Sequence, residues 1–269
     1  MISIFTIIFF LFGLIIGSFL NVVILRFNTQ KSLGGRSACM SCQNSLSWYE
    51  LIPVFSFFFL RGRCKTCKTK ISWQYPAVEF ATASIFALIF LKFQYLFPDR
   101  ILNFSVTYAY YAVMFGILIV VAAYDTKHKI IPDSLSLLFG ILAFIGMFLF
   151  DTQPLSLSFG FFPHLPTWIN LFSGLFLAAP FALFWLVSRG AWMGLGDAKL
   201  TVGLGWMLGF SMGLSAIMIS FWTGAVIGLG LIMFSSKYGL KSEIPFAVYL
   251  VLGTVLVFLC GIQLFPAIF

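Results

Sequence analysis

Four of the five cysteines in this 269-residue sequence form two pairs with the same internal spacing. Cys39 and Cys42 lie in CMSC, and Cys64 and Cys67 lie in CKTC, so each pair reads C-x2-C. Two such pairs can present four thiolates to one tetrahedral ion, which is the requirement of a structural zinc site. We therefore predict one zinc ion bound by these four residues, with two disulfides or free thiols as the alternatives. Cys260 stands alone and is expected to be a packing residue.

Only eight carboxylates are available for acid–base chemistry in the whole sequence. They are Glu50, Glu79, Asp99, Asp125, Asp133, Asp151, Asp197 and Glu243. Six of them have an ordinary structural explanation, such as a solvated loop or a helix N-terminus, where negative charge is favourable. Among these six, Glu79 is expected to open a helix and Asp133 to be a helix N-cap.

Asp125 and Asp197 are less easily explained as structural residues. Asp125 ends an apolar segment, and the C-terminal end of a helix disfavours a carboxylate. Asp197 follows Gly194 and Gly196 in MGLGDAKL, where helix N-capping is an equally good alternative. Ionisable groups at membrane depth are costly and are candidates for function. Two neighbouring carboxyl groups that share one proton can activate water and protonate a leaving amine, as aspartic proteases do.

The two histidines do not supply an alternative catalytic base. His128 lies between Lys127 and Lys129, and His164 lies in a loop that is expected on the opposite face of the membrane. A serine or cysteine triad therefore lacks its base, which leaves the two aspartates as the candidate catalytic pair.

The composition requires that helices crossing a membrane position these residues. Hydrophobic residues make up 61% of the chain, charged residues make up 9%, and the mean hydropathy is +1.04. A soluble domain has roughly 25% charged residues, so a soluble globule and a disordered chain are both excluded. We predict an all-α polytopic membrane protein with about eight transmembrane helices and a small cytoplasmic, zinc-ribbon-like cysteine domain between the first two.

Seven segments have about the 20 apolar residues that a membrane-spanning helix needs. They are residues 3–25, 76–97, 104–124, 134–150, 169–188, 213–234 and 244–264. A shorter, glycine-rich stretch between Asp197 and Gly213 gives the eighth crossing, either as a short span or as a partly re-entrant one. The first segment lacks the basic start of a cleavable signal peptide, so it is expected to be a retained anchor.

The basic residues predict the orientation of these helices. With both termini outside, fourteen Lys and Arg residues fall on the inner side and only Lys92 and Arg100 fall on the outer side. Two crossings separate Asp125 from Asp197, so both carboxylates are expected at the inner, cytoplasmic edge.

The expected organisation has three parts. Residues 1–25 form the first transmembrane helix, residues 26–75 form the cytoplasmic tetra-cysteine domain, and residues 76–269 form a membrane-embedded peptidase domain. Within the second part, LIPVFSFFFL is too short to span and is expected to be a domain core or a strip on the lipid headgroups. Arg63, Lys65 and Lys68 flank the second cysteine pair and are expected to favour its thiolates.

Several motifs in order along the chain resemble one family. They are GSFLNVVILR, the two C-x2-C pairs, RGRCKTCKTKIS leading into YPAVE, YDTKHKIIPD, GLGDAKL and a late IPF. Together these motifs resemble the bifunctional prepilin leader peptidase/N-methyltransferases of bacteria, although GxGD alone is shared with presenilin-like proteases. The resemblance implies that Asp125 and Asp197 are the catalytic aspartates. It adds Asp133, Gly194, Gly196 and Lys199 as neighbouring motif residues.

The same resemblance implies an activity, cofactors and a location. The family cleaves the basic leader of type IV prepilins or pseudopilins at the cytoplasmic edge of the bacterial inner membrane. It then methylates the new N-terminal residue with S-adenosylmethionine, and the cysteine region is associated with methyl transfer. Membrane lipid is a partner and nucleic acid is not. After IPF this chain reads AVYL, where many members have Gly-Pro. A peptidase without methylation, and a non-enzymatic transporter or zinc-ribbon scaffold, remain as alternatives.

Overall fold

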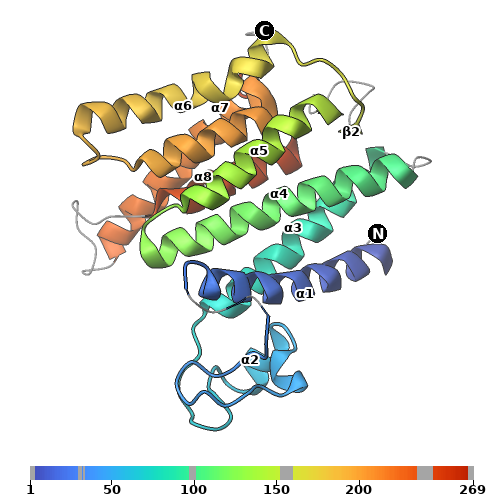
Figure 1. Ribbon diagram of the computed structural model, residues 1–269, viewed down its shortest axis with the longest axis vertical. Coiled ribbons are helices and arrows are strands. Elements are labelled where there is room, and N and C mark those ends of the chain that lie inside the picture. The colour runs from blue at the N-terminus through green and yellow to red at the C-terminus, as the bar shows by residue number, and fades with distance from the viewer. Residues whose placement is uncertain are drawn as a thin grey trace. The chain divides into compact units, whose positions relative to one another are not determined.

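The computed structural model of the protein describes residues 4–29, 32, 34–96, 101–151, 160–234 and 245–265 (Figure 1). Among these residues, five helices are long and apolar enough to cross a membrane, and two shorter helices are also apolar. The chain is a multi-pass membrane protein, as its composition predicts. Some charged residues used in the sequence analysis lie outside the described residues, namely Lys31, Asp99, Arg100, Lys237, Lys241 and Glu243.

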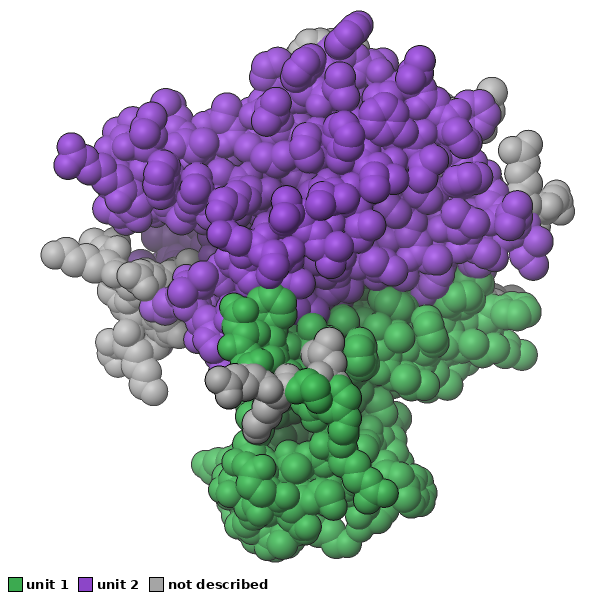
Figure 2. Space-filling view, viewed as in Figure 1, with its two compact units in different colours: residues 1–92 green, residues 93–269 purple. Residues whose placement is uncertain are grey.

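The chain divides into two compact units, residues 1–92 and 93–269, which Figure 2 shows in different colours. The described elements of the first unit are α1 (Ile4–Arg26), η1 (Trp48–Leu51), α2 (Phe55–Phe59) and most of α3 (Gln74–Leu96). Those of the second are α4 (Ile101–His128), α5 (Asp133–Leu149), β1 (Phe150–Asp151), β2 (Gly160–Phe161), α6 (Trp168–Ser188), α7 (Leu195–Phe234) and α8 (Phe246–Cys260). The helical fold class predicted from the sequence is confirmed.

In the first unit, α1 and α3 pack closely through small residues. A Cβ atom added to Gly13 would lie 2.6 Å from the Cα atom of Ala83, and one added to Gly17 would lie 2.7 Å from the Cα atom of Glu79. Only glycine permits such an approach, and the four-residue spacing is typical of helices packed in membranes. Because the partner number falls as the α1 number rises, the two helices are antiparallel.

The segment LIPVFSFFFL forms two short helices, η1 and α2, rather than a span. Phe57 is its buried aromatic residue, and its ring lies 4.7 Å from that of Trp73. Phe55, Phe58 and Phe59 are exposed. This segment therefore contributes one core residue to the first unit and leaves three aromatic side chains on its surface.

In the second unit, α7 packs against α5, α6 and α8, while α4 packs against α5 and α8. The core includes aromatic side chains in tilted contact, with the centre of the Phe258 ring 4.5 Å from that of Tyr111 and 5.1 Å from that of Phe115. After α5 the chain makes a two-residue antiparallel ladder, in which Phe150 pairs with Phe161. These contacts fix the ends of the helices that carry the candidate catalytic residues.

Helix α7 reverses direction at Gly209. Its 40 residues would extend about 60 Å if straight, but Gly209 has φ 75° and ψ 175°, which only glycine adopts readily. A Cβ atom added to Gly213 would lie 3.7 Å from the Cα atom of Gly205, whereas eight residues of a straight helix span about 12 Å. The two halves therefore lie antiparallel. With α7 divided in this way, the described part of the chain has the eight apolar helical segments that the sequence predicts.

The last helix differs from its prediction. It comprises residues 246–260 rather than 244–264, and Gly261 ends it in the left-handed conformation, with φ 65°. Cys260, the last helical residue, is exposed. The expectation that Cys260 is a packing residue is wrong, because it lies on the outward side of the last turn, whose Val257 and Phe258 are buried.

Gly209→Ala should lower the free energy of unfolding by about 1–3 kcal/mol, because an added Cβ atom disfavours the backbone conformation of the reversal. Gly230→Ala is the matched control, since it lies in the same helix with open space around it. This control should stabilise the chain by less than about 1 kcal/mol. Thermal unfolding of both variants in detergent measures the difference. Equal stabilities would contradict a glycine-dependent reversal.

Candidate active site and metal centre

The two cysteine pairs lie in hairpins of the same construction. An isolated bridge between Ala38 and Ser45 closes the first hairpin, and one between Arg63 and Lys70 closes the second. In each hairpin the residue after the second cysteine has a positive φ, 57° in one and 60° in the other. The repeated turn directs both sulfur atoms of each pair toward a common centre.

The four sulfur atoms are arranged as ligands of one metal ion. The Sγ atoms of Cys39, Cys42, Cys64 and Cys67 all lie within 4.8 Å of one another, and those of Cys39 and Cys67 are 3.8 Å apart. A zinc tetrahedron with Zn–S bonds of about 2.3 Å has S···S edges of about 3.8 Å. A disulfide needs about 2.05 Å, and all four thiols are free. The geometry therefore favours a metal site over two disulfides.

Local hydrogen bonds favour the thiolate form of two cysteines in this cluster, whereas the pKa of Cys42 is raised by burial and by the neighbouring cysteines. The side-chain hydroxyl and then the backbone N–H of Thr69 lower the pKa of Cys67 to about 6. The backbone N–H groups of Cys42 and Ser41 lower the pKa of Cys39. Both effects act in the direction that metal binding requires.

Lys65 makes its observed contacts with an aromatic residue rather than with a cysteine. Its Nζ atom donates a hydrogen bond of 2.6 Å to the hydroxyl of Tyr49 and lies 4.9 Å from the centre of that ring. The expectation that Lys65 favours the thiolates stays a prediction, since the observed contacts of its ammonium group are with Tyr49.

Asp125 is buried near the C-terminal end of α4, with 5% of its surface exposed. One carboxylate oxygen, Oδ2, accepts a hydrogen bond of 3.2 Å from the backbone N–H of Ala247, in the first turn of α8. The N-terminal end of a helix carries a partial positive charge. This carboxylate, which stands at the unfavourable end of its own helix, is thus stabilised by the favourable end of another.

Ala247 is a site residue that reasoning from single side chains missed. It contributes its backbone N–H group, which every residue except proline has, so the residue type gives no sign of this role. The available signal was the IPF motif, because Pro245 and Phe246 are the N-cap and first residue of α8.

Asp197 is also buried, with 8% of its surface exposed, and it lies in the first turn of α7. Its backbone N–H donates to the carbonyl of Gly194 at 3.3 Å. Since α7 begins at Leu195, Asp197 is not an N-cap, and that alternative is wrong. The carboxyl groups of Asp197 and Asp125 interact electrostatically. The structure therefore brings together two aspartates that are far apart in the sequence.

The remaining motif residues hold this end of the unit together. A Cβ atom added to Gly196 would lie 2.8 Å from the Cβ atom of Ile131, so this glycine allows α7 to approach the α4–α5 loop. Lys199 and Asp133 form an ion pair of 2.7 Å between α7 and α5, with side chains 43% and 75% exposed. Asp133 is the first residue of α5 and makes no capping bond, so its N-cap prediction is wrong. An ion pair this exposed adds little stability by itself.

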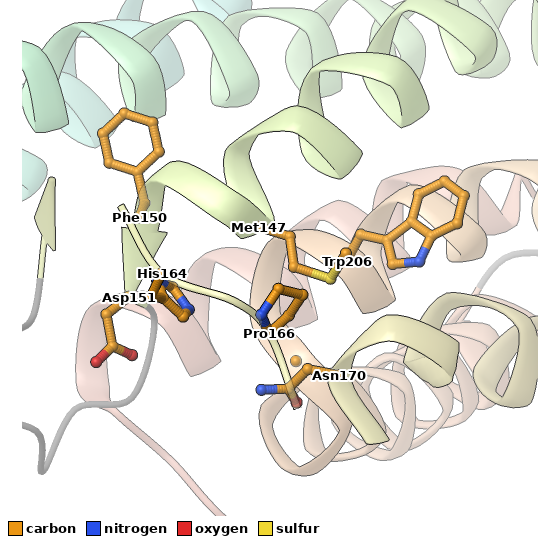
Figure 3. Close-up of a pocket in the computed structure, with 8 residues that line it drawn as sticks. Met147, Phe150, Asp151, His164, Pro166, Asn170 and Trp206 are labelled. Carbon is orange, nitrogen blue, oxygen red and sulfur yellow. The ribbon is translucent and has the colours of Figure 1, made fainter. Parts of the chain in front are cut away.

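The histidines lie at opposite ends of the second unit. His128 ends α4, and its exposed ring stacks on Tyr124 with 4.3 Å between the ring centres. The backbone N–H of His164 donates to the carbonyl of Phe148 at the far end of α5. A cavity of about 20 Å³ lies beside His164 and has room for about one water molecule. Figure 3 shows the residues that line it. The two rings therefore do not share a site.

The structural explanation predicted for one buried carboxylate, that of Glu79, is not the one that the structure shows. Glu79 was expected to open a helix, but α3 begins five residues earlier, at Gln74. Its side chain is 7% exposed and accepts a hydrogen bond of 2.7 Å from the backbone N–H of Val54. The explanation through a helix N-terminus is wrong for this residue.

The chain matches known proteins over nearly its whole length. Residues 11–93 match the bacterial peptidase A24 N-terminal domain, and residues 112–229 match the type IV leader peptidase family. The prepilin leader peptidase/N-methyltransferase of Bacillus subtilis is 33% identical, with 94% of this chain and 93% of the relative covered. Proteins of the same name are 30% identical in Myxococcus xanthus (89% and 67% covered) and 29% identical in Pseudomonas aeruginosa (94% and 90% covered). No solved structure matches the chain.

Metal analysis of the purified protein should find about one zinc ion per chain. Cys64→Ser should lose most of that zinc, because Cys64 is the buried member of the four-sulfur cluster. Cys260→Ser is the control for loss of a thiol and should keep the full zinc content. Equal zinc contents in the two variants, or a metal-free native protein, would rule out the proposed ligand set.

Proposed function

The chain belongs to the type IV leader peptidase family, and from this premise we propose its reaction, its catalytic residues and its orientation. The reaction is cleavage of the basic leader of type IV prepilins or pseudopilins, followed by methylation of the new N-terminal residue. The observation that carries the first step is the pair of buried, electrostatically coupled carboxyl groups of Asp125 and Asp197.

In this proposal the two aspartates hold one water molecule and one proton between them. Two close carboxyl groups do not both ionise readily in a buried site, so one remains protonated. The ionised group takes a proton from water, and the resulting hydroxide attacks the scissile carbonyl carbon. The protonated group then supplies the proton that the leaving amine needs. The hydrogen bond from Ala247 to Asp125 supports an ionised Asp125.

Gly194, Gly196, Asp133 and Lys199 are proposed to position the pair rather than to react. Close packing of Gly196 on Ile131 and the ion pair between Lys199 and Asp133 both hold the first turn of α7, which carries Asp197. Gly194 leaves room beside the carboxylate, since a Cβ atom there would lie 3.8 Å from Oδ2 of Asp197. Small displacements of a reacting group cost large factors in rate.

We place the protein in the bacterial inner membrane, with both aspartates and the cysteine cluster at the cytoplasmic edge and both termini outside. The distribution of Lys and Arg supports this orientation. A substrate with a basic leader keeps that leader in the cytoplasm while its apolar helix lies in the bilayer. Its scissile bond then lies at the depth where the carboxyl groups are proposed to be. The basic inner face of the enzyme suits anionic headgroups better than the basic leader.

Methyl transfer is assigned to the first unit, residues 1–92. This unit contains the expected membrane anchor (1–25), the expected cytoplasmic cysteine domain (26–75) and the start of the expected peptidase part (76–269). S-adenosylmethionine would supply the methyl group. The zinc site would be structural, because all four ligand positions are filled by cysteine sulfur. The transporter or scaffold hypothesis gains no support, since the match to peptidases extends over 94% of the chain.

Asp125→Asn and Asp197→Asn should each lower the rate of precursor cleavage at least about 100-fold, because each removes an acid–base group. Asp151→Asn is the control, since it makes the same change at an aspartate that follows α5, away from the pair. It should lower the rate less than about tenfold. Cleavage of a pilin precursor by the purified variants measures the effect, and full activity in either of the first two variants would disprove the pair.

Mass spectrometry of the cleaved product tests the second activity. With S-adenosylmethionine present, the mature N-terminus should gain the mass of one methyl group, and without it the product should be cleaved but unmodified. An unmodified product in both conditions would leave a peptidase without transferase activity.

A further inference from the structure

The first unit contains a buried carboxylate that neither zinc binding nor peptide cleavage uses. Glu79 on α3 is 7% exposed, accepts a hydrogen bond of 2.7 Å from the backbone N–H of Val54, and lies beside the side chain of Ser18 on α1. In the described part of the chain Glu79 has no cationic partner. Burying a carboxylate without a cation is costly, so this position favours a positively charged ligand.

The residue that donates to Glu79 has an unusual backbone. Val54 has φ 61° and ψ −52°, which is a strained conformation for a β-branched residue. Such strain persists only where the surrounding structure enforces it, and it is concentrated at ligand sites. The carboxylate of Glu79 supplies that enforcement, because it holds the N–H of Val54.

A second buried acceptor, the side-chain oxygen of Asn21, lies about one helical turn from Glu79 and has no hydrogen-bond partner among the described residues. Asn21 is 3% exposed, and its Nδ2 atom donates to the carbonyl of Tyr75 at 3.1 Å. Its Oδ1 atom is buried and has no hydrogen-bond partner among the residues that the structure describes. The close packing of Gly17 on Glu79 places this face of α1 against the first turns of α3. An unpaired buried acceptor costs free energy, and a ligand with N–H donors would satisfy it.

We propose that Glu79 and Asn21 bind the α-ammonium group of the cleaved substrate and that Glu79 accepts its proton before methyl transfer. This inference rests on the transferase half of the proposed function and names its amine site. The groups that meet Glu79 are the side chain of Ser18 on α1 and the backbone N–H of Val54 at the N-cap of α2, and neither is a cation. Asn21 on α1 is bonded to Tyr75, one helical turn before Glu79 on α3. The chemistry that suits the site is therefore that of a primary ammonium ion.

The reaction balances with these groups. One proton passes from the ammonium nitrogen to the carboxylate of Glu79, which frees the nitrogen lone pair. That pair forms the N–C bond to the methyl group of S-adenosylmethionine while the C–S bond breaks and its electrons return to sulfur. The products are a methylated ammonium group and a neutral thioether, and Glu79 later releases its proton to water.

The test separates methyl transfer from cleavage in the full-length protein. Glu79→Gln keeps an oxygen that can accept from Val54 but cannot take a proton. Glu50→Gln is the matched control, because Glu50 also accepts a backbone N–H, from Ser47 at 2.8 Å. With an unmethylated mature-pilin peptide and S-adenosylmethionine, Glu79→Gln should lower kcat for methyl transfer at least about 100-fold. Precursor cleavage should match that of the control.

The pH profile separates a base from a positioning residue. An α-amino group has a pKa of about 8 and loses its proton to solvent as the pH rises. Methyl transfer by Glu79→Gln should therefore rise about tenfold per pH unit below that value, while the native enzyme should show a shallower slope. A loss of methylation with an unchanged pH profile would overturn the proposal, as would methylation equal to that of Glu50→Gln.

If Glu79→Gln also fails to cleave, Asn21→Ser decides the question. This variant removes the Asn21 oxygen that accepts from the ammonium group, so KM for the peptide in methyl transfer should rise about tenfold. Precursor cleavage should be retained. An unchanged KM would overturn the proposal. If the native enzyme cleaves but never methylates, the transferase function itself fails, which is a different result from loss in one variant.

Discussion

Burial of a carboxylate at the end of an apolar helix is the constraint on which the second unit depends. Asp125 lies where the dipole of α4 opposes it, and the hydrogen bond from Ala247 at the start of α8 offsets that disadvantage. The start of α8 therefore has to lie beside the end of α4. The same requirement explains why the chain must return to this end before its last helix, and why Pro245 and Phe246 matter although neither is charged.

Asp197 lies at the same end of the second unit, but on a different kind of helix end. It lies in the first turn of α7, where the helix dipole favours negative charge, and Gly196 lets this turn approach the α4–α5 loop. The two aspartates thus occupy opposite kinds of helix end, and each is supplied with backbone polarity from the N-terminus of a helix. Two acids of the same type acquire different surroundings in this way, which is the condition under which a pair can divide the roles of acid and base.

The sequence predicts the helices and the cysteine cluster well because both depend on local patterns. Apolar segments and C-x2-C spacing are properties of consecutive residues, and the two hairpins around the cysteines repeat one local construction. The functions of individual polar residues were harder to predict, because their partners are distant. Asp133 pairs with Lys199, Lys65 binds Tyr49, and Glu79 holds Val54, none of which follows from neighbours in sequence. Backbone donors such as Ala247 are invisible to an argument based on residue types.

The reversal at Gly209 also limits the length of the helical arm that carries Asp197. The arm from Leu195 to Leu208 has fourteen residues and is about 21 Å long, while the hydrocarbon layer of a bilayer is about 30 Å thick. Most residues of this arm are buried among neighbouring helices, so protein rather than lipid surrounds it. The backbone of the reversal therefore lies closer to the acidic end of the arm than a helix of full bilayer length would place it.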